Sequence, residues 1–194
     1  MSPVRVIRSR TLVLPESNID TDQIIPARFL STTGSAGLDR AAFADWRFDE
    51  QGRERPECVL NEPASADARI LVAGDNFGCG SSREHAVWAL QQFGFQAVIS
   101  SRLADIFTAN ALKNGLLAVT VDADSHAWLL DHPGARLTIN VAAGHIAIPG
   151  RPRLRFELDP FTRTCLLDGV DTMGYLLARQ DAIAHFERHR QEAG

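Results

Sequence analysis

Residues 69–121 read RILVAGDNFGCGSSREHAVWALQQFGFQAVISSRLADIFTANALKNGLLAVTV, and short apolar segments alternate there with longer amphipathic ones. The apolar segments have the length and composition of buried strands, and the amphipathic segments have those of helices. Glycine follows each amphipathic segment, at Gly94 and Gly115, where it favours the C-terminal cap of a helix. Strands and helices that alternate at such short spacings form right-handed crossovers, so the run predicts a parallel sheet with helices packed on it. The expected strands are 69–73, 97–100 and 116–121, and the expected helices are about 82–93 and 103–113.

The segments on either side extend this unit into one domain. The first of them alternates loosely and predicts an opening strand. Later in the chain, two short strand-like segments joined at Ala142–Ala143–Gly144 predict a β-hairpin. The expected further elements are strands at 4–13, 136–141, 145–148 and 154–158 and a C-terminal helix at 172–189. Residues 1–194 are therefore expected to form a single α/β domain, with a mainly parallel core sheet, flanking helices and a β-hairpin region.

A long connection at 31–67 separates the opening strand from the central unit. It is rich in Gly, Asp and Arg and contains one amphipathic island, FADWRF at 43–48. A loop of this length in a compact domain is usually functional or disordered, so we expect this connection to be mobile.

Composition excludes several classes of protein. The net charge of the 194 residues is −4, without a basic cluster along the sequence, so a nucleic-acid partner is not expected. No apolar run has transmembrane length and the first residues lack the apolar core of a signal peptide, so we expect a cytoplasmic protein without a membrane partner. Cys58, Cys79 and Cys165 are an odd number and lie far apart, which argues against a disulfide framework and against an iron–sulfur cluster or other metal held by this chain.

The segment 74–86, GDNFGCGSSREHA, is the strongest candidate for a functional site. Its three glycines follow a predicted strand and precede a predicted helix, and glycine allows a ligand to approach the backbone closely. The free N–H groups and the dipole at a helix N-terminus favour an anion. Arg83 can grip a carboxylate with two hydrogen bonds, while Ser81 or Ser82 can act on a proton or donate to an oxyanion. We therefore expect the site to bind a substrate with one or more carboxylates.

Structural roles compete with these chemical ones. Ser81 and Glu84 have the spacing of a capping box, in which the serine only satisfies helix N–H groups. His85 fits an ordinary helix-face residue, and Cys79 fits a small buried residue as well as a reactive thiol. The segment lacks the third glycine of a dinucleotide fingerprint, the lysine of a P-loop and the G-x-S-x-G of the hydrolase elbow.

Three segments together resemble a known family. They are Asn18–Pro26 (NIDTDQIIP), Phe77–Ala86 (FGCGSSREHA) followed by Trp88–Ala89–Leu90, and Ala104–Phe107 (ADIF) followed by Asn110. In this combination they are similar to the small subunits of isopropylmalate isomerase, which are swivel domains of the aconitase superfamily. The resemblance runs in order over essentially the whole chain, and it implies a swivel-type β/α domain.

The resemblance implies roles for the residues of the GSSRE segment. Ser81 matches the catalytic serine that removes or returns the proton at carbon. Arg83 matches the arginine that binds a substrate carboxylate, and Ser82 beside them is expected to add backbone or hydroxyl contacts to the substrate.

The T-D-x-I segment carries further implied substrate-binding residues. Asp22 matches an active-site aspartate of the superfamily, and Thr21 precedes it in the same motif. Arg28 is the candidate counterpart of a further substrate arginine, although the local pattern differs from that of full aconitases. The alternative for Asp20 and Asp22 is a solvated Asx turn. The residues after Pro26 are expected to read the side group of the substrate.

The reaction that the resemblance implies is the isomerisation of 2-isopropylmalate and 3-isopropylmalate in leucine biosynthesis, through loss and return of water at isopropylmaleate. Such a hydro-lyase needs a [4Fe–4S] cluster, which the family holds in a separate large subunit, so a heterodimer is expected and this chain alone should fold but be inactive. The 31–67 connection would then become ordered against the large subunit or the substrate, with Trp46 and Phe48 as candidate anchors. Plain core packing of the two aromatic residues is the alternative.

Three other functions stay open at this point. The nearest is a related hydro-lyase that acts on homoaconitate, citraconate or another alkylmalate. A non-catalytic module that binds a dicarboxylate is the second. The third is a stand-alone serine or thiol enzyme, which is disfavoured because neither Ser81 nor Cys79 has an evident His partner in the sequence.

Overall fold

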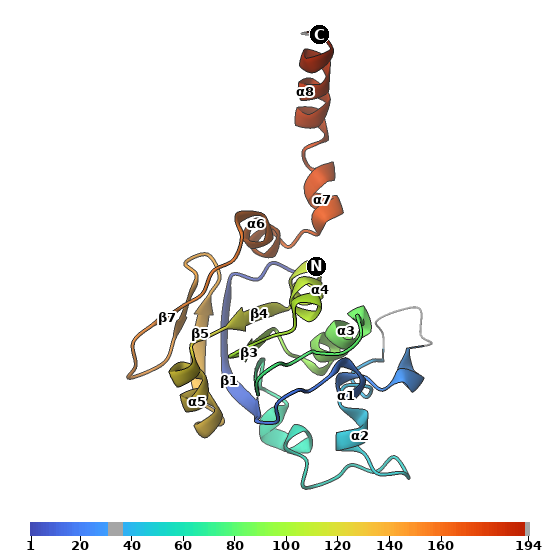
Figure 1. Ribbon diagram of the computed structural model, residues 1–194, viewed down its shortest axis with the longest axis vertical. Helices are drawn as coiled ribbons and strands as arrows, with labels where there is room; N and C mark the ends of the chain where they lie inside the picture. Colours follow the sequence, from blue (N-terminus) through green and yellow to red (C-terminus); the bar gives the residue numbers. More distant parts are fainter. Residues whose placement is uncertain (31–36, 193–194) are drawn as a thin grey trace.

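The computed structural model describes residues 1–30 and 37–192, and in these residues seven strands form one sheet in the order β4-β3-β2-β1-β5-β6-β7 (Figure 1). Four neighbouring strands, β1 to β4, are parallel, and the remaining three continue the sheet in antiparallel fashion from β1. A mainly parallel core with a hairpin region is thus confirmed. The strands are β1 (Val6–Leu14), β2 (Ile70–Ala73), β3 (Ala97–Ser100), β4 (Leu117–Thr120), β5 (Arg136–Asn140), β6 (His145–Ala147) and β7 (Leu154–Arg155).

Helices cover both faces of the parallel half. On one face, α3 (Glu84–Phe93) and α4 (Asp105–Asn114) are the two crossover helices that the sequence predicts, and Gly94 and Gly115 follow them with positive φ. On the other face α5 (Ala123–Asp131) packs against β1 and β2. Alternate residues of each strand point to the two sides, so Leu71 and Ala73 belong to one hydrophobic core and Ile70 and Val72 to the other.

The connection before β2 is packed over the first of these cores in the part that the structure describes, residues 37–67. It contains α2 (Ala44–Arg47) and two 3₁₀ turns, η2 (Val59–Asn61) and η3 (Pro63–Ser65). Phe43 is fully buried and its N–H donates to the carbonyl of Ile24 at 2.8 Å. Trp46 packs partly buried against the same core, as the core-packing alternative requires. The mobility of the connection stays a prediction, and residues 31–36 of it lie outside the described part.

Three features of the fold differ from expectation, two in the helices and one in a strand. Neither α5 nor α6 (Pro160–Asp168) was expected, although each begins with a capping aspartate, Asp122 and Asp159, whose side chain accepts from a backbone N–H of the first turn. The single C-terminal helix expected at 172–189 is wrong, because it divides into α7 (Thr172–Leu177) and α8 (Gln180–Glu192). The predicted strand at 154–158 is reduced to the two residues of β7.

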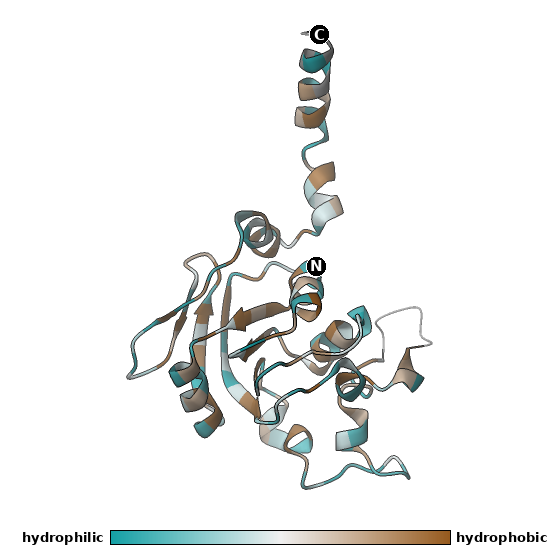
Figure 2. Ribbon diagram, in the orientation of Figure 1, coloured by the Kyte–Doolittle hydropathy of each residue, from teal (hydrophilic) through white to brown (hydrophobic). Residues whose placement is uncertain are grey.

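The C-terminal helices extend away from the body of the molecule (Figure 1). Figure 2 shows hydrophobic residues along both of them, and Leu177 and Phe186 are 61% and 65% exposed. No helix in the described ranges is both long and apolar enough to cross a membrane.

Candidate active site

The glycine-rich loop after β2 lies between the segments that follow the two neighbouring strands. Gly78 N–H donates to the carbonyl of Ile19 at 2.8 Å, and Thr21 N–H donates to that of Cys79 at 2.9 Å. On the opposite side, Ala104 N–H donates to the carbonyl of Phe77 at 3.0 Å. The loop therefore continues the parallel sheet beyond its regular strands, and it lies at their carboxyl ends, where open α/β sheets bind ligands.

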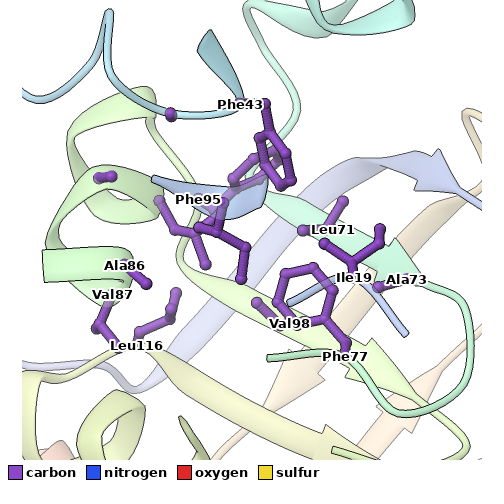
Figure 3. Packing of buried hydrophobic residues seen from close by; sticks show 14 of the residues in the cluster. Ile19, Phe43, Leu71, Ala73, Phe77, Ala86, Val87, Phe95, Val98 and Leu116 are labelled. Carbon is purple, nitrogen blue, oxygen red and sulfur yellow. The ribbon is translucent and has the colours of Figure 1, made fainter. Parts of the chain in front are cut away.

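Close packing fixes the course of this loop. Phe77 is fully buried and lies beside Ile19 and Ala73 (Figure 3). Its ring meets that of Phe107 edge-on, with the centroids 5.2 Å apart. Gly78 has a φ of 76°, and a Cβ atom there would lie 2.3 Å from the Phe107 ring, so only glycine fits.

Ser81 lies directly against the short helix α1 (Thr21–Ile24). The hydroxyl of Thr21 donates to the backbone carbonyl of Ser81 at 3.0 Å, and its oxygen is 3.4 Å from the Ser81 hydroxyl oxygen. These contacts join residues 60 positions apart in the sequence. The fold thus brings the T-D-x-I and GSSRE segments into one site.

Arg83 pairs with Asp22 across the same contact. A guanidinium nitrogen of Arg83 donates to a carboxylate oxygen of Asp22, and Arg83 also lies 3.4 Å from the carbonyl oxygen of Ile25. The side chain of Arg83 is 17% exposed, whereas that of Asp22 is 57% exposed. The guanidinium of Arg83, which is predicted to bind a substrate carboxylate, is therefore already paired with the carboxylate of Asp22.

The predicted capping box of Ser81 and Glu84 is not formed. Helix α3 begins at Glu84, two residues later than expected, and Arg83 precedes it without a side-chain cap. Ser81 and Ser82 consequently lie on the loop, with the Ser81 side chain turned to Thr21. Within the part of the chain that the structure describes, the backbone N–H groups of Ser81, Ser82 and Arg83 have no protein acceptor. Three consecutive backbone donors of the loop are thus left without a protein acceptor.

A capping box does form at α1. The carboxylate of Asp20 accepts from the N–H of Gln23 at 2.8 Å, and the Gln23 side chain accepts from the N–H of Asp20 at 2.9 Å. Asp20 therefore has a local structural role, as a helix cap rather than in the solvated Asx turn given as the alternative, and Asp22 is left to pair with Arg83. Sequence spacing held the signal, since Asp20 and Gln23 also have the spacing of a capping box.

Glu84 links the first turn of α3 to the last residues of α4 through a hydrogen bond and an ion pair. Its carboxylate accepts from the side-chain amide of Asn114 at 2.8 Å and lies 3.3 Å from the ammonium of Lys113. The hydrogen bond from Asn114 is the main cause that lowers the pKa of Glu84, and Lys113 adds to it. Asn114 also accepts from the Trp88 indole at 3.0 Å. Glu84 therefore holds the helix that follows Arg83 rather than acting in the capping box predicted for it.

Several residues that sequence reasoning missed support the base of the loop. The buried hydroxyl of Ser100 lies 2.8 Å from the carbonyl oxygen of Gly74, and the buried imidazole of His126 donates through Nε2 to the carbonyl of Ala73 at 2.7 Å. The carboxylate of Asp75 pairs with Arg102 at 2.7 Å. Ser100 ends a strand that reads as apolar, and a polar residue at that point was the available signal.

The other predicted residues lie near the site or apart from it. Arg28 pairs with Asp45 at 2.5 Å and lines a cavity of about 680 Å³ with residues of the 37–67 segment. No contact between Arg28 and Ser81 or Arg83 is present in the described residues, so its role stays a prediction. The partly buried thiol of Cys79 lies 3.5 Å from the carbonyl oxygen of Asn18, and the His85 ring packs against Trp88.

The chemistry that this arrangement supports is proton transfer next to a carboxylate. A hydroxyl, a guanidinium and backbone N–H groups without protein acceptors belong to three consecutive residues of the loop, and donors of these kinds stabilise negative charge that develops on oxygen. In the described ranges no cluster of three or more His, Cys, Asp or Glu side chains could hold a metal ion. The three thiols lie apart, on the 37–67 segment, in the loop and in α6.

Comparison with known proteins gives consistent matches over most of the chain. The aconitase C-terminal domain family matches residues 4–124. The 3-isopropylmalate dehydratase small subunit of Anaeromyxobacter sp. (strain K) is 57% identical, over 98% of this chain and 100% of the relative. That of Roseiflexus castenholzii is 50% identical, over 96% and 94%. The crystal structure of a 3-isopropylmalate dehydratase from Methanocaldococcus jannaschii is similar with a TM-score of 0.68 at 28% identity, over 93% of this chain and 98% of that one.

Proposed function

The chain belongs to the aconitase C-terminal domain family and, within it, to the 3-isopropylmalate dehydratase small subunits, and from this membership we propose that it forms half of the active site of that hydro-lyase. The reaction is the interconversion of 2-isopropylmalate and 3-isopropylmalate through isopropylmaleate in leucine biosynthesis. The other half of the site belongs to a large subunit, and the heterodimer acts in the cytoplasm.

One observation carries this proposal. The T-D-x-I and GSSRE segments, which are far apart in the sequence, meet through Thr21 and Ser81 and through Asp22 and Arg83. A hydroxyl that can exchange a proton thus lies in the same short loop as a guanidinium that can bind a diacid. A module that only binds dicarboxylates would need the guanidinium but would have no use for the hydroxyl.

Ser81 is the base in the proposed mechanism. An ordinary serine hydroxyl is a weak base, so the alkoxide form needs donors that hold its negative charge. The N–H groups of Ser82 and Arg83 are candidates for this, because they follow Ser81 directly in the loop and have no protein acceptor in the described residues. The Thr21 hydroxyl is a third candidate, but it must turn from the Ser81 carbonyl to the Ser81 hydroxyl oxygen before it can donate there. Ser81 takes the proton from the carbon next to a carboxylate and returns a proton there when water adds back.

Arg83 holds that carboxylate. As the carbon loses its proton, negative charge spreads onto the carboxylate oxygens, and a charge-assisted hydrogen bond to a guanidinium strengthens with that charge. Arg83 must first exchange Asp22 for the substrate. Asp22 is mostly exposed and can move into solvent, so this exchange leaves no buried charge unpaired.

The loss of hydroxide needs a Lewis acid, which we assign to the partner. The residues of this chain do not fit a [4Fe–4S] cluster, because Cys58, Cys79 and Cys165 lie in separate segments and Cys165 is buried. A cluster in the large subunit would supply an open iron that withdraws the hydroxyl. All steps assigned to this chain are proton transfer and carboxylate binding.

The residues after Pro26 are proposed to determine substrate specificity. Residues 27–29 form the turn η1, which follows helix α1 in the chain, and Arg28 in this turn forms an ion pair with Asp45. A panel of isopropylmalate, homoaconitate and citraconate separates the proposed activity from that of the related hydro-lyases. The proposal predicts the highest kcat/KM for isopropylmalate.

Reconstitution with the large subunit tests the proposed role of Ser81. Ser81→Ala should assemble as wild type does and lose at least ~100-fold in kcat, the usual scale for a lost proton-transfer group. Ser17→Ala is the matched control, since Ser17 is exposed and precedes the site segment. Turnover by Ser81→Ala near the wild-type rate would exclude Ser81 as the base. Tight binding of diacid by the lone chain, without turnover in any complex, would favour the binding module instead.

A further inference from the structure

A second cleft, of about 540 Å³, opens on the antiparallel half of the sheet. Its lining includes Arg8 and Arg10 of β1 and Arg136 of β5. Among the described residues that form the cleft, none is an Asp or a Glu. The sequence shows no basic cluster because these arginines belong to segments more than a hundred residues apart, and only the fold assembles them.

Strand pairing places the three side chains on one face. Arg10 stands directly opposite Arg136 in the β1–β5 ladder, which puts their Cβ atoms about 5 Å apart. Arg8 lies two residues along β1 and projects from the same face, about 7 Å from Arg10. All three residues are exposed. Like charges directly opposite one another destabilise a sheet, so this arrangement is unfavourable without an anion.

The chain leaves these three charges unneutralised. Ion pairs in the described residues involve Arg28, Arg53, Arg83, Arg102 and Lys113, and several arginines outside the cleft also make none, so it is the grouping of three unpaired arginines that distinguishes the cleft. The side chains of Arg8, Arg10 and Arg136 have no ion pair or hydrogen bond in the same part of the chain. Acidic residues outnumber basic ones, 24 to 20, so the lack of a carboxylate here does not follow from composition.

We propose that this cleft is a second anion site, which binds a small molecule carrying two acidic groups. Guanidinium groups bind carboxylates and phosphates with two parallel hydrogen bonds, and three of them can hold two such groups at once. The volume lies within the ~300–1,000 Å³ typical of small-molecule sites. Ile148 and Pro149 add apolar surface that can contact the body of the ligand.

The cleft is separate from the Ser81 and Arg83 site. Arg8 and Arg10 precede the end of β1 at Leu14 by four to six residues, which corresponds to about 13–20 Å along the strand. The glycine-rich loop with Ser81 and Arg83 lies beyond that end, next to the segment that follows Leu14. Ligands of the two sites therefore do not compete for the same guanidinium.

Calorimetric titration of the full-length chain tests the proposal, with pyrophosphate and succinate as probes at constant ionic strength. All titrations use the Arg83→Gln background, because Arg83 would otherwise bind the same probes. We expect saturable binding of one molecule per chain for at least one probe, and the probe that binds tells a phosphate from a carboxylate ligand. Adding Arg10→Gln and Arg136→Gln should weaken this binding at least tenfold, whereas the control Arg188→Gln, on α8, should leave it unchanged.

Three results would overturn the proposal. The first is the absence of saturable binding for both probes, and the second is equal binding when Arg10 and Arg136 are replaced. The third is binding by the lone chain that disappears in the complex with the large subunit, which would make the cleft a contact surface for acidic residues of that subunit. A melting temperature raised by the probe in the parent chain, but not in the double replacement, would support the site independently.

Discussion

At the scale of the single residue, the pairing of Asp22 with Arg83 is the most informative contact in the molecule. Two aspartates that stand two positions apart in the same motif have different roles, since Asp20 caps α1 and Asp22 pairs with Arg83 of the glycine-rich loop. The sequence predicts that both Asp22 and Arg83 belong to the site. It does not predict that they pair, because only the contact between residues 61 positions apart brings them together.

Replacing Arg83 and replacing Asp22 should change the affinity for substrate in opposite directions. Arg83→Gln loses a charge-assisted hydrogen bond of about 1.5–3 kcal/mol and should raise KM for isopropylmalate by about 10- to 150-fold. Asp22→Asn removes the internal competitor for Arg83 and should lower KM. Steady-state kinetics of the reconstituted enzyme gives both values. A rise in KM for both variants would show that Asp22 orients Arg83 and does not compete with substrate.

At the scale of the element, the course of the glycine-rich loop depends on Gly78 and on where helix α3 begins. The strand–helix pattern of residues 69–121 could be predicted from sequence, because each element there is bounded by its own turn residues. The start of α3 could not, since the spacing of Ser81 and Glu84 suits a cap as well as a loop. The tertiary contact with Thr21 decides between them.

Two glycine substitutions separate the effect of the clash at the loop from that of backbone strain. Gly78 and Gly134 have nearly the same φ, 76° and 78°, but a Cβ at Gly134 would meet nothing within 4 Å. Gly134→Ala should therefore cost about 1–2 kcal/mol for the left-handed conformation alone. Gly78→Ala should cost a further ~1–3 kcal/mol for the overpacking against Phe107. Urea denaturation of both variants measures the difference, and equal losses would contradict the assigned role of Phe107.

Glu84 should make stability depend on acidity. Its pKa is lowered in the folded chain, so the carboxylate contributes stability above its ordinary pKa of 4.5, and the contribution is lost as the pH falls through the lowered folded value. The free energy of unfolding of wild type should exceed that of Glu84→Gln near neutral pH, and the two should converge in acid. Asn114→Ala should remove most of the dependence, since Asn114 is its main cause. A difference that grows on acidification would be inconsistent with this assignment.

Helices α5 and α6 show where pattern reading fell short at this scale. Each has a strong start signal, with an aspartate cap at Asp122 or Asp159 and, in α6, a proline at the first helical position. Capping residues were the better guide there.

At the scale of the whole molecule, the body and the C-terminal helices have different relations to the core. The body buries both faces of its parallel sheet, whereas α8 leaves Ile183 and Phe186 at the surface. Periodicity predicted a helix at 172–189. It did not predict that α7 and α8 extend away from the body (Figure 1), because an amphipathic pattern does not specify what its apolar face contacts. The order of strands was not predictable in full either, since β1 and β5 pair across most of the chain.

Removal of α8 should leave the body intact. A chain that ends at Ala178 loses exposed apolar side chains and little buried area, so its melting temperature should stay within about 3 °C of the full-length value. Circular dichroism melts of both chains test this, with unchanged near-ultraviolet spectra as the control for the core. A fall of more than about 8 °C would mean that α8 packs on the body in solution.

The division of the active site between two polypeptides is the claim on which the whole account depends. The decisive measurement is the rate of isomerisation of 2-isopropylmalate by this chain alone, by the large subunit alone and by their mixture. Turnover is expected only in the mixture, and none is expected when the mixture contains Ser81→Ala. Turnover by this chain alone, in preparations free of iron and of the large subunit, would contradict that claim.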